Sequence, residues 1–205
     1  MKKLVSVFVF FLLITTVMIS AQDQPVIEEN TDDPPVYRYD LGDQIYSVSA
    51  APLINLFIWI PTETPSVIAK KMKVGGYISL GWEAFIDHKS SIGAELGYSF
   101  ARSLDERLYT SVPILAKFSH FLIDGEFDLP ISIAVGGVYS SFEDQHYFGL
   151  MVKPEISAYW NINDEWGLGL RTAYWFIPEL YFGENSSKTS YGNFLTIQAA
   201  VKYTQ

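Results

Sequence analysis

The chain has 205 residues, of which 49% are hydrophobic, 16% aromatic and 18% charged, and it contains no cysteine. The length suits one domain, and the lack of cysteine excludes disulfide scaffolds, thiolate nucleophiles and cysteine-based zinc sites. A net charge of -9 argues against nucleic acid as a partner, because phosphate binding needs a basic face. Few charges and many aromatic residues are typical of a protein that lies in a membrane.

Residues 1–21 have the layout of a secretory signal peptide. Two lysines near the start precede an apolar stretch over 4–19, and small residues stand before a polar run. This order predicts export, with cleavage after about Ala21. An uncleaved helical anchor is the alternative, but the apolar stretch is short for a membrane span.

Residues 22–43 are acidic and contain prolines. Seven Asp and Glu residues are opposed by one basic residue, Arg38. Such a segment cannot bury enough apolar surface to offset the entropy of ordering it. We therefore expect a flexible periplasmic tail, and a solvated linker is favoured over a binding role.

From residue 44 onward, apolar residues alternate with small or polar ones. Between Val74 and Ile86, for example, every second residue is apolar or small, and the positions between them include Ser79 and Glu83. Strict alternation indicates strands with two unlike faces. The pattern predicts eight strands, over residues 44–52, 73–87, 91–102, 108–122, 128–142, 147–161, 166–181 and 193–204.

The connections between these strands alternate in character. Short polar turns lie around His88, Asp124 and Asp164, whereas the intervening connections, such as 53–72, are longer or more variable. Short turns on one rim and longer loops on the other are typical of an outer-membrane barrel with both termini in the periplasm. The sequence thus predicts an all-β fold, an eight-stranded antiparallel up-and-down transmembrane β-barrel over residues 44–205.

The composition of the two strand faces favours a membrane barrel over a soluble one. One face carries mostly small residues, which suit the narrow interior of an eight-stranded barrel, whereas soluble barrels cover their exterior with charged side chains. The other face carries bulky residues and faces membrane lipid in this interpretation. Its aromatic side chains are expected in two interfacial bands. The expected members are Trp160, Trp166 and Tyr203 at the periplasmic ends, and Tyr98, Phe100, Tyr109, Tyr139, Phe148, Tyr174 and Phe176 at the outer ends.

Charged residues of both signs fall at one depth on the small-residue face. We expect them to form a salt-bridge layer inside the barrel, because an unpaired buried charge is costly. A selectivity ring or proton relay is one interpretation, and a structural plug is favoured because eight strands leave no continuous aqueous channel. The layer consists of Glu83, Glu95, Lys117, Glu155 and Arg171, while Lys153 lies on the same face further toward the outside.

Three segments carry a resemblance to a known family. VPILAKFSHF (Val112–Phe121), WGLGLRTAYWF (Trp166–Phe176) and the final LTIQAAVKYTQ are similar to strands of the small eight-stranded outer-membrane barrels, the OmpX and OmpW types and the transmembrane half of OmpA. In general appearance the chain resembles uncharacterised small barrels of spirochaete outer membranes. The resemblance covers roughly residues 41–205. It implies that the outer-membrane assembly machinery recognises the last strand, although Gln205 stands where the family usually ends in an aromatic residue.

The sequence offers little for catalysis. His88 and Ser90 form an H-x-S string faintly like that of outer-membrane lipid A deacylases, but a turn histidine is favoured. His120 is expected at the membrane interface and His146 at a loop tip. No common catalytic or phosphate-binding motif occurs. We therefore expect a protein that is not an enzyme and has no cofactor or metal.

The segment from Pro52 to Pro61 is too apolar for an ordinary exposed loop, and a cluster of lysines follows it. It either extends the first strand and folds over the barrel mouth or dips into the outer leaflet. Leu56, Phe57 and Trp59 are the candidate apolar site at the mouth, which could admit small hydrophobic molecules as OmpW-type barrels are thought to do. Packing of these residues over the lumen is favoured, and the lysines could contact anionic head groups.

The leading functional hypothesis is an integral outer-membrane barrel with a plugged lumen and a structural or surface-interaction role. The first alternative is a binding site or conduit for small hydrophobic molecules at the mouth. The second alternative is a lipid-modifying outer-membrane enzyme.

Overall fold

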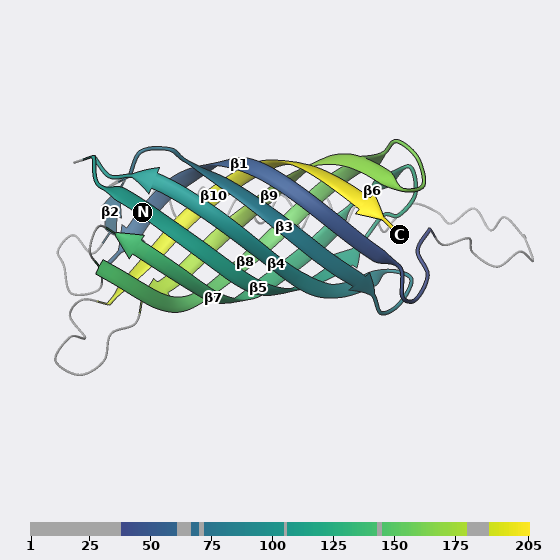
Figure 1. Ribbon diagram of the computed structural model, residues 1–205, viewed down its shortest axis with the longest axis horizontal. Helices are drawn as coiled ribbons and strands as arrows, with labels where there is room; N and C mark the ends of the chain where they lie inside the picture. Colours follow the sequence, from purple (N-terminus) through teal and green to yellow (C-terminus); the bar gives the residue numbers. More distant parts are fainter. Residues whose placement is uncertain (1–37, 61–66, 70–71, 105, 143–144, 180–188) are drawn as a thin grey trace, which may run out of the picture. The chain divides into compact units, whose positions relative to one another are not determined.

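The computed structural model describes residues 38–60, 67–69, 72–104, 106–142, 145–179 and 189–205, and it is a closed antiparallel barrel (Figure 1). Its eight long strands are β1 (Gln44–Trp59), β3 (Gly75–Phe85), β4 (Ser90–Arg102), β5 (Leu108–Phe121), β7 (Pro130–Phe142), β8 (Gln145–Asn161), β9 (Trp166–Glu179) and β10 (Ser190–Thr204). Short β2 (Val67–Ala69) pairs with β1, and short β6 (Phe127–Asp128) pairs with β8. Among the described residues, no helix is long and apolar enough to cross a membrane.

The strands follow one another around the barrel in chain order, and β10 pairs with β1 to close it. The predicted eight-stranded up-and-down barrel is thus confirmed. The predicted fifth strand is divided at Leu129 into β6 and β7. The first strand continues to Trp59 rather than ending near residue 52, because the apolar run stays paired with β10, with Trp59 opposite Tyr191.

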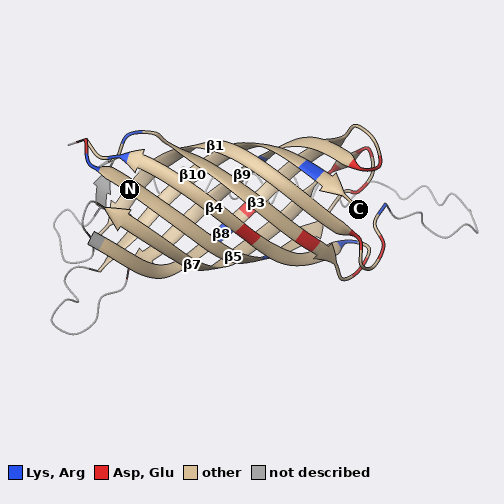
Figure 2. Ribbon diagram, viewed as in Figure 1, with Lys and Arg blue, Asp and Glu red and all other residues tan. Residues whose placement is uncertain are grey.

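The period-two pattern separates an outer wall from a filled interior. In β3, Ile78 and Leu80 are 59% and 58% exposed, whereas Tyr77, Ser79 and Glu83 are buried. Side chains that alternate along a strand point to opposite faces. The wall is therefore apolar toward its surroundings, and Figure 2 shows few charged residues along it and more at the two ends.

The short turns predicted around His88 and Asp164 lie at one end of the barrel. The turns after β3 and β8 are short and closed by backbone hydrogen bonds, from Ile86 N to Ser90 O and from Ile162 N to Trp166 O, each 2.9 Å. The C-terminal end of β10 lies at the same end (Figure 1). We call this the periplasmic end, as in outer-membrane barrels, and the opposite one the outer end.

Candidate functional site

Six charged side chains from five strands meet in the middle of the lumen, and each is at most 7% exposed. They are Glu83 of β3, Glu95 of β4, Lys117 of β5, Lys153 and Glu155 of β8, and Arg171 of β9. We call them the ionic cluster. Three carboxylates and three cations leave the cluster without net charge, which reduces the cost of burying it.

Glu155 lies at the centre of the cluster. Its carboxylate accepts hydrogen bonds from Arg171 Nε at 3.0 Å and from Arg171 Nη2 at 2.8 and 2.9 Å. Lys117 Nζ lies 3.1 Å and Lys153 Nζ 3.2 Å from the same carboxylate. Each cation also reaches a second acid, so that removing one member leaves its neighbours with incomplete partners.

The other two acids have hydroxyl partners as well as cations. Glu95 is 2.5 Å from Lys153 Nζ and 2.8 Å from Arg171 Nη2, and Tyr77 donates to it at 2.6 Å. Glu83 is 3.0 Å from Lys117 Nζ and accepts hydrogen bonds from the hydroxyls of Ser91 and Ser119. Hydrogen bonds of this kind satisfy the lone pairs that an ion pair alone leaves unused.

The structure brings all five residues of the predicted layer together, and it adds Lys153. The sequence placed Lys153 further toward the outside because it precedes Glu155 by two positions on the inward face of β8. Two residues span only about 7 Å along a strand, and the flexible four-carbon stem of lysine covers that distance. The reach of the lysine side chain is the feature of the sequence from which Lys153 could have been assigned to the ionic cluster.

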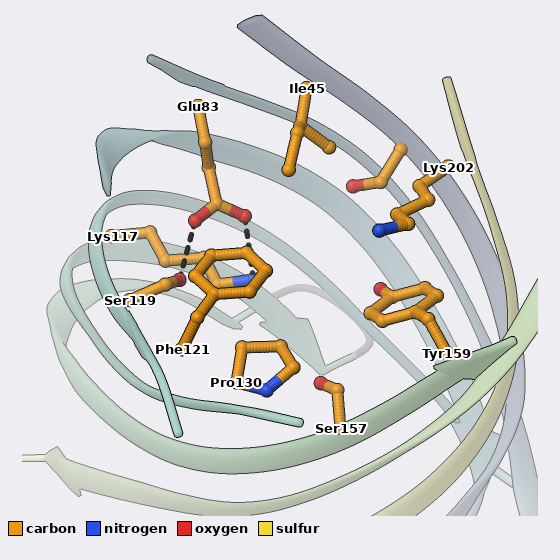
Figure 3. A pocket seen from close by; sticks show the side chains of 10 residues that line it. Ile45, Glu83, Lys117, Ser119, Phe121, Pro130, Ser157, Tyr159 and Lys202 are labelled. Carbon is orange, nitrogen blue, oxygen red and sulfur yellow. Dashed lines mark hydrogen bonds and ion pairs between the residues drawn. The ribbon is translucent and has the colours of Figure 1, made fainter. Parts of the chain in front are cut away.

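A cavity of about 10 Å³, enough for about one water, lies beside the ionic cluster (Figure 3). Glu83 and Lys117 border it on the cluster side. Lys202 and Tyr159 border it toward the end of β10, with Lys202 Nζ 5.2 Å from the centre of the Tyr159 ring. Three charged side chains, Glu83, Lys117 and Lys202, thus share this small space with apolar and hydroxyl-bearing residues.

The outer half of the lumen is filled by apolar side chains. Trp175 packs edge-on against Tyr77, with ring centres 4.5 Å apart, and Tyr109 stacks on Phe194 at 6.2 Å. The expectation that Tyr109 belongs to the outer aromatic band is wrong, because it shares the inward face of β5 with Leu115. This outer core comprises Leu53, Tyr77, Ala101, Tyr109, Leu115, Ala134, Val138, Met151, Ala173, Trp175, Ile177 and Phe194.

The candidate mouth residues lie on a strand rather than in a loop. The register of β1 against β10 shifts between Asn55 and Phe57, so that Leu56 occupies a bulge. Beyond it Trp59 stacks on Tyr191, with ring centres 4.9 Å apart, and Tyr191 stacks on Phe176 at 5.9 Å. Because Phe176 lies on the outward face of β9, this register directs Phe57 and Trp59 outward as well.

The histidine and serine of the H-x-S string bind different partners. His88 Nδ1 lies 2.9 Å from the carbonyl oxygen of Tyr39, whereas Ser90 Oγ lies 3.1 Å from Nδ1 of His120. Within the described ranges, no group of three or more His, Asp or Glu residues is arranged to hold a metal ion.

Comparisons with known proteins agree with the barrel geometry. A protein-family model matches residues 27–203, which is most of the chain. The structure of Neisserial surface protein A has a TM-score of 0.58 at 9% identity, covering 79% of this chain and 98% of that one. OprG from Pseudomonas aeruginosa has a TM-score of 0.53 at 10% identity, covering 83% of this chain and 99% of that one.

Two uncharacterised proteins of Treponema pallidum are related in sequence. One is 25% identical over 133 residues, covering 65% of this chain and 60% of its own length. The other is 21% identical over 108 residues, covering 49% of this chain and 37% of its own length. The chain thus spans less than two thirds of either relative. The chain has the closed fold of the small eight-stranded outer-membrane β-barrels.

Proposed function

We propose that this outer-membrane barrel does not conduct ions, is not an enzyme, and has a structural or surface-interaction role. The observation that carries the proposal is the layering of the lumen. An apolar core fills the outer half, the ionic cluster fills the middle, and aromatic side chains fill the periplasmic end. An eight-stranded barrel has room for little more than its own inward side chains.

The ionic cluster opposes opening of a water path through the barrel. A continuous path would require the salt bridges of Glu155 and Glu95 to separate, and each of these carboxylates is held by at least two cations. The outer core would also have to give way, and it contains the large side chains of Trp175 and Tyr77. Both layers would have to move together.

Single-channel recording in planar bilayers tests the proposal. We expect the refolded chain to insert and give no stable conductance, while a porin added afterwards to the same bilayer gives its usual steps. Stable unitary conductance from the purified chain would refute the closed lumen. Comparison of outer-membrane lipids from cells with and without the gene tests the non-enzymatic assignment, which a gene-dependent change in lipid structure would contradict.

The structural account of the cluster has a separate test. Glu95→Ala and Arg171→Ala each leave buried partners with incomplete charge compensation, so we expect the folded, heat-modifiable band on gels to be lost at lower temperature than in the wild type. If both variants behave like the wild type, the cluster does not hold the barrel together.

We also infer that the outer-membrane assembly machinery recognises β10. Ile197 and Val201 on its outward face are 49% and 38% exposed, and Tyr203 continues the same face. The terminal Thr204-Gln205 departs from the usual aromatic ending. Gln205→Phe is expected to increase the yield of folded barrel in cells, and an unchanged yield would show that Tyr203 already provides the signal.

Access for small hydrophobic molecules through the wall is the second candidate function, and the ladder between β8 and β9 favours it. In the part of the chain that the structure describes, these strands pair from Val152↔Phe176 toward the periplasmic end. The described outer ends, Gln145–Met151 and Ile177–Glu179, are paired with other strands but not with each other. The described outer ends therefore hold this seam with fewer backbone hydrogen bonds than a continuous ladder would.

Pro154 lies beside this seam and cannot donate a backbone hydrogen bond. Across the described part of the seam, the Tyr147 hydroxyl donates to the carbonyl oxygen of Pro178 at 3.3 Å. Behind it lie Met151 and Ile177 of the outer core. A hydrophobic molecule that entered here would meet an apolar interior.

Vesicles carrying the refolded barrel and a trapped hydrophobic dye test this second function. We expect faster dye release than from empty vesicles, and slower release for Pro154→Val, which restores an N–H group to the seam. Pro113→Val is the matched control, because Pro113 lies at a similar interruption of the ladder between β4 and β5, and that ladder is paired again on the outer side at Ser99↔Ser111. Release equal to that of empty vesicles would remove this candidate.

A further inference from the structure

The residues directly before β1 bend back over the periplasmic end and insert one side chain into it. We call Arg38–Asp43 the strap. Tyr39 is fully buried, and its ring stacks on Phe85 with centres 4.3 Å apart and planes 13° apart. The ring centre of Phe121 lies 5.3 Å from it. Aromatic contacts of this geometry add to the gain from burying the ring.

The Tyr39 hydroxyl completes a polar group at the bottom of this pocket. It donates to Asp128 Oδ2 at 2.5 Å and accepts from Lys202 Nζ at 2.6 Å, and Lys202 forms an ion pair with Asp128. Burial, together with the Asp128 carboxylate, raises the pKa of Tyr39 above its ordinary value. The hydroxyl therefore remains a donor at neutral pH, and the pocket is matched to a phenol.

Arg38 ties the strap to two periplasmic turns. Its guanidinium donates to the carbonyl oxygens of Gly125 at 3.1 Å, Asn163 at 2.9 Å and Asp164 at 3.1 Å. The strap backbone also continues the ladder between β1 and β3, with Gly42 N donating to Phe85 O at 3.0 Å and Phe85 N to Asp43 O at 2.9 Å. In contrast, Leu41 in the same segment is 73% exposed.

These partners come together only in a complete barrel. Phe85, Phe121, Asp128 and Lys202 belong to β3, β5, β6 and β10, and Lys202 is 163 residues from Tyr39 in the sequence. Until β10 has paired with β1, the pocket for the Tyr39 ring is incomplete. We propose that the strap is a lock that closes on the finished barrel and holds its last strand in place.

The proposal separates the two directions of the folding reaction. Some contacts form only after the transition state of folding. Removing such a contact raises the unfolding rate and leaves the folding rate unchanged. For Tyr39→Ala we expect unfolding in urea to be faster by about tenfold or more, with refolding into vesicles within about twofold of the wild type. Tyr39→Phe keeps the stacked ring and loses the hydrogen bonds, so its unfolding rate is expected between the two.

Leu41→Ala is the matched control, because it shortens an exposed side chain in the same segment and is expected to change neither rate. The lock would be overturned if Tyr39→Ala slowed refolding by as large a factor as it speeds unfolding, or if its unfolding rate were unchanged. A Tyr39→Ala chain that cannot refold would also overturn it, because the strap would then be needed before closure.

Trypsin gives a direct measure of strap opening in the folded protein. Arg38 is the sole Lys or Arg between residues 22 and 69, so that cleavage after it gives a unique loss of mass from a chain that begins at Gln22. We expect this cleavage to be slow in the wild type and in Leu41→Ala, and about tenfold faster in Tyr39→Ala, because the open population rises with loss of the contact. Equal cleavage rates in all three would show that the strap is open in the native barrel and would refute the lock.

Discussion

Glu155→Gln tests the ionic cluster with the smallest change of shape. The glutamine keeps an oxygen that can accept from Arg171, but it removes one charge from the centre of the cluster. Two carboxylates, Glu83 and Glu95, then face three buried cations, Lys117, Lys153 and Arg171, which leaves one positive charge uncompensated.

The expected loss of stability is about 4 kcal/mol, because removing one partner of a buried ion pair costs about 3–5 kcal/mol. The remaining hydrogen bond from Arg171 keeps the loss below the upper limit, while the presence of three cations keeps it above the lower one. A loss of this size is a large fraction of the free energy of unfolding of an ordinary domain, about 5–15 kcal/mol. At room temperature, the variant is therefore expected to unfold partially at a lower urea concentration than the wild type.

The assay is reversible urea unfolding of the barrel in lipid vesicles, followed by tryptophan emission. A second variant, Glu155→Gln with Lys153→Met, removes one charge of each sign and serves as the control for charge balance. Because Lys153 is one of the cations left in excess, we expect the double variant to be less destabilised than the sum of the two single changes by about 1–3 kcal/mol. A loss below about 1 kcal/mol in Glu155→Gln, or strict additivity, would refute electrostatic compensation as the basis of the cluster.

Three further changes probe other parts of the barrel. Gly93→Ala would place Cβ 1.9 Å from the backbone oxygen of Trp82, so we expect the free energy of unfolding to fall by about 3 kcal/mol and the melting temperature in a gel-shift assay to fall with it. Gly192→Ala is the control, because its nearest contact is 3.1 Å away on a side chain and it should lower the stability far less. Leu96→Arg places a charge on the outward face and should cost about 2–4 kcal/mol in vesicle refolding assays. Asn55 is buried, and neither its amide nitrogen nor its oxygen is hydrogen-bonded to a described residue. Asn55→Leu should therefore stabilise the barrel by about 1 kcal/mol in urea, and destabilisation would reveal a partner for the amide.

Most of the wall could be predicted from the sequence because each strand separates two different environments. In β3, Ile78, Leu80 and Trp82 face outward, and the alternation with small and polar residues is unbroken. The outer part of β1 was harder, because residues 53–59 are apolar on both faces except at Asn55 and contain a bulge at Leu56. Where the lumen is itself apolar, period two disappears from the sequence.

The same apolar lumen explains the misplacement of Tyr109. An aromatic residue near a strand end suggested the membrane interface, but an apolar outer lumen accepts an aromatic ring equally well. The alternation of side chains along β5 was the better guide, since Tyr109 is separated by an even number of positions from the inward Lys117 and therefore shares its face. A charged residue fixes which face is inward, and its neighbours at even spacing follow.

The strap could not be recognised from composition. An acidic, proline-bearing segment predicts a flexible tail on average, whereas the packing of Tyr39 depends on one side chain and on partners up to 163 residues away. Arg38 was noted as the one basic residue of the segment, but its three carbonyl partners lie in turns whose positions exist only in the folded barrel. Averages over a segment are insensitive to such specific contacts.

The position of the ionic cluster suggests that it contributes to strand register as well as to stability. Replacing a buried ion pair by apolar residues can be neutral or stabilising, so stability alone does not explain why five strands each carry an inward charge. A slip of one residue would turn the charges of a strand toward lipid, at a cost of about 2–4 kcal/mol for each lysine or arginine at mid-depth. We infer that the cluster penalises every such slip. Because the chain has no cysteine, a disulfide between cysteines at the paired outward positions Ala94 and Ala116 reports the native register, and its yield should fall when the six charges are replaced together. An unchanged yield would mean that the apolar wall sets the register by itself.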